Sequence, residues 1–308
     1  MNKKIAVVGA GNVGAACAQY LAEANLADVV MIDIVEGLPQ GKALDLSQAG
    51  PVRGYNSMVT GSNDFAALKG ADIVVMTAGL ARKPGMTRED LLTKNAEIVG
   101  GVAKEIKKHA SKSFVIVVSN PLDLMTYHMM KVTGFPKERV VGQAGVLDST
   151  RFRTFIAMEL GVAMRDVQAM VLGGHGDTMV PLSRYTTVAG VPIGELIPKE
   201  RIKEIEDRTA NGGGEIVKLL KTGSAYYAPA AASVEMVRSI FNDEKRLLPC
   251  SCYLNGEYGI TDMYIGVPCI LGAKGIEKII ELKLNKAELS SLQKSASTYK
   301  EHMKIMGY

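Results

Sequence analysis

A histidine set among glycines is the first residue whose type and surroundings suggest chemistry. His175 lies in the segment Gly173-Gly174-His175-Gly176-Asp177, where small neighbours leave the ring little side-chain packing and suit the close approach of a substrate. An imidazole with an ordinary pKa near ~6.5 exchanges a proton around neutral pH. The histidines at 109, 128 and 302 lie in helical patterns and fit structural roles better. His175 is therefore the candidate acid–base group.

A base needs a partner that orients its ring, and the segment Leu147-Asp148-Ser149-Thr150-Arg151 offers one. Asp148 can hold the imidazole in one tautomer and stabilise its charged form, as the third member of a catalytic triad does. Arg151 follows three residues later, so both side chains face the same way on a helix. The alternative is that Asp148 caps the helix that begins there, and one residue can fill both roles.

Two more arginines lie in the segment Leu80-Ala81-Arg82-Lys83-Pro84-Gly85-Met86-Thr87-Arg88. The segment follows a strand pattern and contains Pro and Gly, which predicts a loop at the carboxyl edge of a sheet and a possible lid over a ligand. A guanidinium binds a carboxylate through two parallel hydrogen bonds. Solvated surface charge is the alternative for a single loop arginine, but Arg82, Arg88 and Arg151 together indicate an anionic substrate.

A glycine-rich loop near the N-terminus indicates a dinucleotide site. The run Gly9-Ala10-Gly11-Asn12-Val13-Gly14 follows an apolar strand and opens a helix, so the unpaired N–H groups of that helix can face a pyrophosphate. Asp33 closes the next strand, 19 residues after Gly14, near the spacing of about 20 that this fingerprint requires. A carboxylate there accepts both ribose hydroxyls and repels a 2′-phosphate, so the expected cofactor is NAD rather than NADP.

The elements that would position these residues alternate in the first half of the chain. Continuous apolar strands separated by helices are typical of a parallel sheet covered on both faces, and right-handed crossovers make that sheet doubly wound. The fold class is therefore α/β, with a Rossmann NAD-binding domain over residues 1–145. The expected strands are Lys4–Val8, Val29–Ile32, Ile73–Thr77, Phe114–Ser119 and Val140–Gly142, and the clearest helices are Gly14–Ala24 and Ala96–His109.

The pattern changes after residue 145, and residues 146–308 are expected to form an α+β substrate and catalytic domain. A long helical region, Pro198–Lys221, contains Asn211-Gly212-Gly213-Gly214, and three glycines at ~1 kcal/mol each predict a kink or a break there. Asn255-Gly256 is expected to form a two-residue turn between two strands. A final helix carries one apolar stripe, made of Leu289, Leu292, Ala296, Tyr299, Met303 and Met306.

Composition excludes several classes of protein for this chain of 308 residues. With 47% hydrophobic and 22% charged residues, it is not disordered, collagen-like or a coiled coil. The net charge of +4 is spread along the chain, so no nucleic-acid or membrane partner is expected. No apolar run approaches the ~18 residues of a membrane span, and the short start before Gly9 is unlike a signal peptide, so a cytoplasmic protein is expected. The four cysteines lack zinc-site spacing and predict buried thiols without a metal.

The motifs together resemble a known family. The chain is similar to the lactate/malate dehydrogenase superfamily, and most similar to its NAD-dependent malate dehydrogenases of the bacterial, lactate-dehydrogenase-like type. The resemblance covers essentially the whole chain and rests on the glycine loop at 9–14, the arginine loop at 81–88, Ser119-Asn120-Pro121, the segment 147–151 and Gly174-His175-Gly176-Asp177. No catalytic position departs from the family pattern.

The resemblance implies roles for the substrate-site residues. The family oxidises (S)-malate reversibly to oxaloacetate with NAD, and His175, paired with Asp148, would take the hydroxyl proton while a hydride passes to the nicotinamide. Arg151 would bind the C1 carboxylate and Arg88 would polarise the carbonyl. Asn120 would hydrogen-bond the substrate oxygen.

The same resemblance implies a cofactor site, a partner class and a place in metabolism. Family members form homodimers or homotetramers, act on a small dicarboxylate and serve the tricarboxylic acid cycle. The residues expected to hold NAD are Gly9, Ala10, Gly11, Asn12, Val13, Gly14, Asp33, Asn95, Val118, Ser119 and Asn120.

Arg82 is expected to choose the substrate. In this superfamily the position carries Gln in lactate dehydrogenases and Arg in malate dehydrogenases. A guanidinium pairs with a second carboxylate, whereas the methyl group of lactate would leave the buried charge without a partner, at a cost of several kcal/mol. The alternatives are a lactate or other 2-hydroxyacid dehydrogenase and, from another class, a dinucleotide-binding protein without turnover. The intact His175, Asp148 and three arginines argue against the second.

Overall fold

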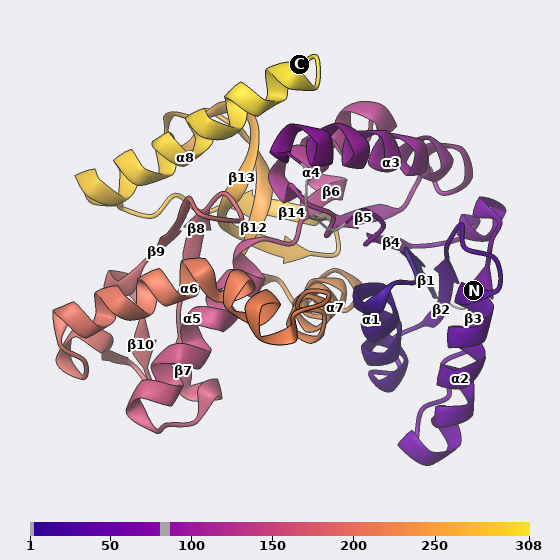
Figure 1. Cartoon of the computed structure of the whole chain (residues 1–308), viewed down its shortest axis with the longest axis horizontal. Helices are drawn as coiled ribbons and strands as arrows, with labels where there is room; N and C mark the ends of the chain where they lie inside the picture. Colours follow the sequence, from indigo (N-terminus) through magenta and orange to yellow (C-terminus); the bar gives the residue numbers. More distant parts are fainter. Residues whose placement is uncertain (1–2, 81–86) are drawn as a thin grey trace.

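One large sheet runs through the structure and carries both halves of the chain (Figure 1). The computed structural model describes residues 3–80 and 87–308. In this part of the chain eleven strands join: ten follow the order β3-β2-β1-β4-β5-β6-β12-β13-β8-β9, and β14 pairs with β13 in addition. A separate small sheet joins β11, β10 and β7. The chain therefore enters the second half of the molecule without leaving the main sheet.

The first six strands are parallel, and all but β3 are almost wholly apolar and largely buried. From β1 the chain adds β2 and β3 toward one edge of the sheet. It then returns to β4, on the other side of β1, and adds β5 and β6 in the opposite direction, so the strand order reverses between β1 and β4. This confirms the predicted α/β fold with a doubly wound parallel sheet. The strands are β1 (Lys4–Val8), β2 (Asp28–Ile32), β3 (Val59–Ser62), β4 (Ile73–Met76), β5 (Phe114–Val117) and β6 (Val140–Gly142).

Helices cover both faces of this parallel part (Figure 1). Helix α1 packs against α7 on one side, and α3 packs against α4 on the other. The sequence pattern missed α2, because its apolar residues form no clear stripe, and missed β3, whose four residues include only one buried apolar side chain. The first four helices are α1 (Asn12–Glu23), α2 (Leu38–Arg53), α3 (Arg88–His109) and α4 (Leu122–Thr133).

The second half adds antiparallel strands to the end of the parallel sheet. Strand β12 pairs with β6 at Ser251 and Gly142, and then with β13 along its length. Because the sheet is continuous, the division at residue 145 stays a prediction. The strands are β7 (Val167–Gln168), β8 (Val171–Gly173), β9 (Met179–Pro181), β10 (Thr187–Val188), β11 (Val191–Pro192), β12 (Arg246–Asn255), β13 (Thr261–Gly272) and β14 (Gly275–Ile279), and the helices are α5 (Gly145–Leu160), α6 (Lys199–Leu220), α7 (Tyr227–Phe241) and α8 (Lys286–Ile305).

Two local predictions for this half are wrong. Helix α6 continues through its three glycines without a break, because Gly212 lies against the neighbouring helix: a Cβ there would come 3.2 Å from the Arg151 Cδ atom. The connection after β12 is longer than the expected two-residue turn, since the Gly256 N–H donates to the Ile260 carbonyl at 2.9 Å. At α6 a tertiary contact outweighs the low helix propensity of glycine. After β12 the chain forms a longer loop than the Asn-Gly pair predicts.

The cysteines agree with the prediction of buried thiols. Cys17 lies on α1, the other three lie on β12 and β13, and all four are buried and free of disulfides. The apolar stripe predicted on the last helix is also present, since Leu292, Ala296 and Met303 of α8 are buried. Across residues 3–80 and 87–308, no helix combines the length and the apolarity needed to cross a membrane.

The glycine at position 14 allows a test of how tightly β1 and α1 pack. A Cβ at Gly14 would lie 1.8 Å from the Gly9 carbonyl oxygen, so we expect Gly14→Ala to lower the free energy of unfolding by about 3 kcal/mol and to weaken NADH binding. The matched control is Gly101→Ala within α3, where no atom lies within 4 Å of the added Cβ; this variant should gain about 0.5–1 kcal/mol. Urea denaturation measures the free energy of unfolding of both variants. Equal effects of the two substitutions would contradict the packing argument.

Candidate active site

The candidate base lies on a short loop between two paired strands. His175 follows β8 and precedes β9, and its Nδ1 lies 2.9 Å from Oδ2 of Asp148 on α5. The side chains are 13% and 2% exposed, respectively. This brings together the two residues that the sequence predicted as partners. Because Asp148 engages Nδ1, Nε2 is the ring nitrogen available to a substrate.

Asp148 holds a second candidate residue as well. Its Oδ1 accepts a hydrogen bond of 3.1 Å from the Arg151 guanidinium, which is 14% exposed and lies one helical turn further along α5. Helix α5 begins at Gly145, with Ala144 as its N-cap residue. The side chain of Asp148 therefore does not cap the helix, and it is committed to the two cationic partners.

The surroundings of His175 favour its charged form. Burial lowers the pKa of the ring, but the Asp148 carboxylate raises it more, through its charge and its hydrogen bond, so the pKa of His175 lies above its usual value of 6.5. The positive charge of Arg151 opposes this shift in the pKa, and the carboxylate of Asp123 supports it. An imidazole that is held ready to accept and keep a proton suits acid–base work near neutral pH.

A second buried carboxylate fixes the backbone of the same loop, and the sequence analysis missed it. Asp123, in the first turn of α4, accepts hydrogen bonds from the His175 N–H at 2.9 Å and from the Ser251 hydroxyl at 2.6 Å. It is 1% exposed, and burial raises the pKa of its carboxyl to about 6. The local signal was weak, because an acidic residue in the first turn of a helix also stabilises the helix dipole.

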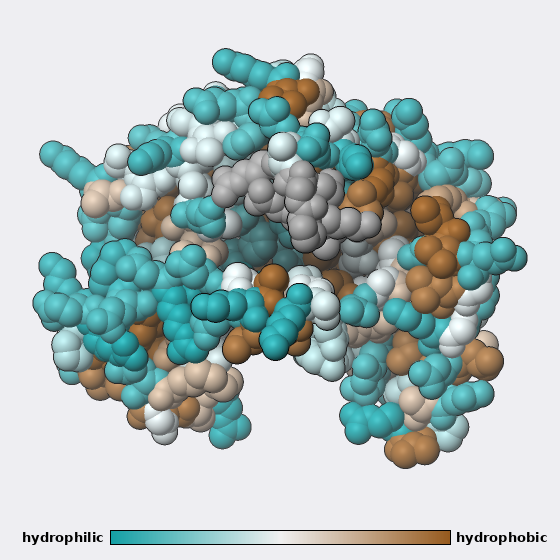
Figure 2. Space-filling model, viewed as in Figure 1, coloured by the Kyte–Doolittle hydropathy of each residue, from teal (hydrophilic) through white to brown (hydrophobic). Residues whose placement is uncertain are grey.

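The side chains of Arg151 and His175 border a cavity of about 370 Å³. Figure 2 shows a hollow near the middle of the face that is turned toward the viewer. A second cavity of about 290 Å³ adjoins the first, because both are lined by Asn120 and His175. The first cavity is lined by Val13, Val118 and Asn120 from the parallel half, by Arg151 and His175, and by Gly213, Gly214, Ser224 and Pro229, which the sequence analysis did not assign.

The glycine loop has the shape that a pyrophosphate needs. Gly9 adopts a φ of 102°, and a Cβ there would lie 2.7 Å from the Ala78 nitrogen, so the turn requires glycine. At Gly11, by contrast, an added Cβ meets nothing within 4 Å, which leaves the backbone open to a ligand. No side chain caps α1, and its first turn has no acidic residue. The residues present therefore fit the NAD phosphates.

Two side chains hold the peptide groups of Ala10, in the middle of the glycine loop. The Ala10 N–H donates to Oδ2 of Asp33 at 2.6 Å, and Lys42 of α2 donates to the Ala10 carbonyl at 2.7 Å. Asp33 follows β2 directly, as predicted, and its other oxygen accepts from the Val35 N–H at 2.9 Å. Lys42 was not anticipated, because nothing in the sequence shows that α2 lies beside the glycine loop.

Two other residues expected at the cofactor, Ser119 after β5 and Asn95 on α3, contact the loops that follow β4 and β5. The Ser119 hydroxyl donates to the Ala78 carbonyl at 2.6 Å, which joins the two loops. Asn95 is fully buried: its Oδ1 accepts from the Leu80 N–H, and its Nδ2 donates to the carbonyls of Leu80 and Asn120. Its contacts are therefore those of a residue that positions the Asn120 loop.

Two of the predicted arginines cannot be placed in this cavity. Arg82 lies outside the described residues, and Arg88 is described only as the first residue of α3. The start of α3 is well defined, because the side chains and backbone N–H groups of Thr87 and Asp90 form a reciprocal capping box. The helix therefore begins immediately after the arginine loop.

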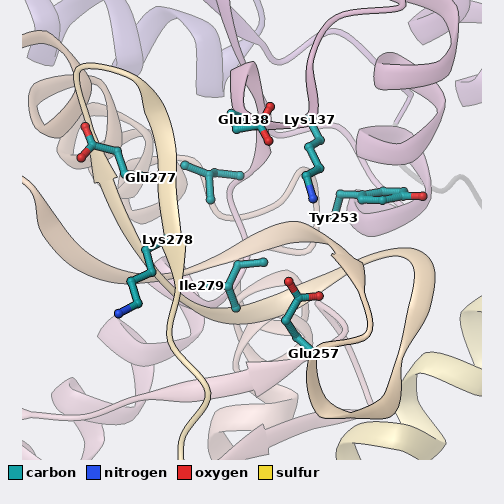
Figure 3. A pocket seen from close by; sticks show the side chains of 8 residues that line it. Lys137, Glu138, Tyr253, Glu257, Glu277, Lys278 and Ile279 are labelled. Atoms are coloured by element: carbon teal, nitrogen blue, oxygen red, sulfur yellow. The ribbon is translucent and has the colours of Figure 1, made fainter.

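A separate cavity of about 160 Å³ lies beside β14 and offers no comparable chemistry. Its wall mixes Glu138, Glu257 and Glu277 with Lys137 and Lys278 (Figure 3). It shares no residue with the cavity at His175. Its mixed charges, without a histidine or an arginine in its lining, favour no particular ligand.

Comparison with known proteins agrees with this geometry. Residues 3–142 match a family model described as lactate/malate dehydrogenase, NAD binding domain, and residues 145–306 match the alpha/beta C-terminal domain of the same family. A malate dehydrogenase from Roseiflexus sp. is 57% identical over 96% of this chain and 96% of its own.

Solved structures of both named activities are equally similar in fold. A malate dehydrogenase from Cryptosporidium parvum is 44% identical with a TM-score of 0.97, and each chain is covered completely. A lactate dehydrogenase from Cryptosporidium parvum, complexed with lactic acid and β-nicotinamide adenine dinucleotide, is also 44% identical, with a TM-score of 0.96 over 100% of this chain and 98% of its own.

Asp123 provides a stability test of the site. Asp123→Ala would leave the His175 N–H and the Ser251 hydroxyl without an acceptor in the interior, so we expect a loss of about 2–4 kcal/mol in the free energy of unfolding. Ser251→Ala removes one donor and should cost about 1 kcal/mol. Urea denaturation at pH 7.5 compares the two. If Ser251→Ala proved the more damaging variant, the carboxylate would not be the centre of this network.

Proposed function

The chain belongs to the lactate/malate dehydrogenase family, and we propose that it is an NAD-dependent malate dehydrogenase whose proton-transfer group is His175. It oxidises malate to oxaloacetate and catalyses the reverse reduction. The observation that carries the proposal is the buried contact of 2.9 Å between His175 Nδ1 and Asp148, at a cavity that Arg151 also lines. Relatives that are 55–57% identical over nearly their full length are named malate dehydrogenase.

The acid–base step follows from the contacts of His175. In the oxidation, Nε2 accepts the proton of the substrate hydroxyl, and Asp148 stabilises the resulting imidazolium through Nδ1. In the reduction, the imidazolium returns that proton to the carbonyl oxygen. NAD, when bound, supplies the hydride acceptor for the oxidation, and NADH supplies the donor for the reduction.

Substrate binding uses arginines around this histidine. Arg151 binds the C1 carboxylate in the cavity, and Asp148 holds the guanidinium in place through its Oδ1. Arg88 polarises the carbonyl as charge develops on its oxygen. Asn120 donates a hydrogen bond to the same oxygen. The roles of Arg88 and Arg82 rest on the sequence motif alone.

Asp33 selects the cofactor. Its carboxylate stands at the end of β2 beside the glycine loop, where it accepts the adenosine ribose hydroxyls and repels the 2′-phosphate of NADP. The backbone of Gly9–Gly14 receives the pyrophosphate, with Ala10, Asn12 and Val13 contributing the peptides between the glycines. Val118, Ser119 and Asn120 border the nicotinamide, and Asn95 keeps their loop in position.

Arg82 distinguishes malate dehydrogenase from lactate dehydrogenase, the second candidate. The fold cannot make this distinction, since the two Cryptosporidium parvum enzymes match this chain equally well. A guanidinium facing the far end of the substrate pairs with the second carboxylate of oxaloacetate, whereas the methyl group of pyruvate leaves it unpaired. The substrate is therefore a dicarboxylate.

Three further statements belong to the same proposal. The protein works as a homodimer or homotetramer, acts in the cytoplasm and serves the tricarboxylic acid cycle. Residues 1–145 bind the cofactor, and residues 146–308 supply His175, Asp148 and Arg151. Analytical ultracentrifugation tests the oligomeric state.

Replacing Arg82 by Gln tests the substrate assignment. We expect Arg82→Gln to lower kcat/KM for oxaloacetate by about 100-fold or more, because the second carboxylate loses its charged partner, while kcat/KM for pyruvate rises, because pyruvate no longer leaves a guanidinium unpaired. NADH oxidation at 340 nm measures both. Arg165→Gln, at an exposed position, is the control and should change neither rate. An Arg82→Gln enzyme with normal oxaloacetate turnover would refute the specificity argument.

The raised pKa of His175 predicts opposite pH profiles for the two directions. Reduction requires the imidazolium, so its kcat/KM falls as the pH rises through a value above 6.5, whereas kcat/KM for oxidation rises over the same range. Asp148→Asn removes the charge that raises this pKa, so both transitions should move to lower pH, with kcat reduced by about 100-fold or more. Asp166→Asn on the exposed surface is the control. A profile that does not move in Asp148→Asn would dissociate Asp148 from the proton transfer.

A further inference from the structure

The loop that carries His175 is rich in glycine. Its seven residues from Gly173 to Met179 include three glycines, and two of them, Gly173 and Gly176, have φ values of 84° and 152°. Glycines widen the range of backbone conformations open to a chain. The Asp148 contact orients the ring and the Asp123 contact holds the N–H of His175. Gly173 and Met179 close the loop as a strand pair, and the Met179 N–H donates to the Gly176 carbonyl at 3.2 Å. Gly174 and Thr178 are held by another part of the chain.

The C-terminal helix supplies these additional contacts. Ser295 of α8, which is 1% exposed, accepts a hydrogen bond of 2.9 Å from the Gly174 N–H and donates one of 2.7 Å to the Thr178 hydroxyl. One turn later, the Tyr299 hydroxyl donates to the carbonyl of His175 at 3.3 Å. Helix α8 therefore contacts the loop before, at and after the catalytic residue, although 117 or more residues separate them in the chain.

The ring of Tyr299 also explains one of the glycines. A Cβ at Gly174 would lie 2.0 Å from Cε2 of Tyr299 and 2.6 Å from Cζ. The sequence suggested that the small residues around His175 make room for a substrate, but at Gly174 the space is filled by this ring. Any larger residue would displace either the ring or the loop.

Tyr299 takes no direct part in proton transfer. Burial raises the pKa of its hydroxyl well above the usual range, and the nearby carboxylates of Asp123 and Asp148 raise it further. The hydroxyl therefore stays protonated at every pH at which the enzyme works, and it remains a hydrogen-bond donor to the backbone.

We propose that Tyr299 and Ser295 are positioning residues for the catalytic step, and that they form a clamp from α8 that fixes the His175 loop. Tyr299 holds the His175 carbonyl and packs on Gly174, and Ser295 ties Gly174 to Thr178. The proposal rests on the assignment of His175 as the acid–base group. It assigns a part in the reaction to the C-terminal helix, which lines the adjoining cavity of about 290 Å³ with Thr298, Tyr299 and His302 but contributes no residue to the cavity at Arg151.

The first experiment removes the Tyr299 hydroxyl and keeps the ring. We expect Tyr299→Phe to lower kcat for oxaloacetate reduction by about three- to tenfold, with KM for oxaloacetate and NADH within twofold of the original and an unchanged Tm. The control is Tyr308→Phe, which removes a hydroxyl that lies 2.7 Å from Nδ1 of His128, away from the cavity. A general loss of stability would lower Tm, and a binding defect would raise KM, so either result in place of a reduced kcat would overturn the clamp.

The second experiment tests the packing of the ring on Gly174. Gly174→Ala should lower kcat by tenfold or more in the original protein, but by clearly less in a Tyr299→Ala background, because the clash is then gone. This double-mutant cycle isolates the contact from the separate effects of the two substitutions. Additive effects would overturn the packing argument.

A measurement without turnover separates the clamp from the proposed function. Hydrogen–deuterium exchange of the peptide covering residues 171–181 should become faster in Tyr299→Phe and Ser295→Ala, and stay unchanged in Tyr308→Phe. If exchange is faster in Tyr299→Phe and Ser295→Ala, but the original protein does not reduce oxaloacetate, the clamp stands and the enzyme assignment is rejected. If the original protein reduces oxaloacetate rapidly, but Tyr299→Phe changes neither the exchange rate nor kcat, the enzyme assignment stands and the clamp is rejected.

Discussion

The site depends on one buried carboxylate with two cationic partners. Asp148 is 2% exposed, and it accepts from His175 through one oxygen and from Arg151 through the other. A buried charge is costly unless it is paired and hydrogen-bonded, so the position of Asp148 constrains the side chains of both His175 and Arg151. Helix α5 can satisfy this constraint because it begins directly against β8: a Cβ at Gly145 would lie 2.5 Å from the Val171 carbonyl.

The continuous sheet brings the remaining contacts of the loop together. Strand β12 extends the parallel sheet in the antiparallel sense and places Ser251 beside β6, where its hydroxyl reaches Asp123 at the start of α4. Asp123 in turn binds the backbone of His175. The half that carries the glycine loop and the half that carries the histidine are thus joined through buried polar groups whose loss would leave donors unsatisfied.

Substrate choice within the family is separate from this framework. Malate and lactate dehydrogenases from one organism match this chain with TM-scores of 0.97 and 0.96, so the backbone is compatible with either activity. Our proposal assigns this choice to the charged side chain at position 82, because a guanidinium needs an anionic partner when water is excluded.

Residues with a local signal could be predicted from the order of amino acids. The first strand, the glycine loop and Asp33 follow one another within 33 residues, and Asp148 and Arg151 share one face of a helix, so their spacing was enough to predict them. Contacts between distant segments came only from the folded chain: Asp123 with Ser251, Lys42 with Ala10, and Tyr299 with Gly174. The continuity of α6 through its glycines was decided in the same way, by close packing on Arg151. Periodicity and spacing describe neighbours along the chain, whereas these interactions depend on which surfaces the folded sheet and helices bring together.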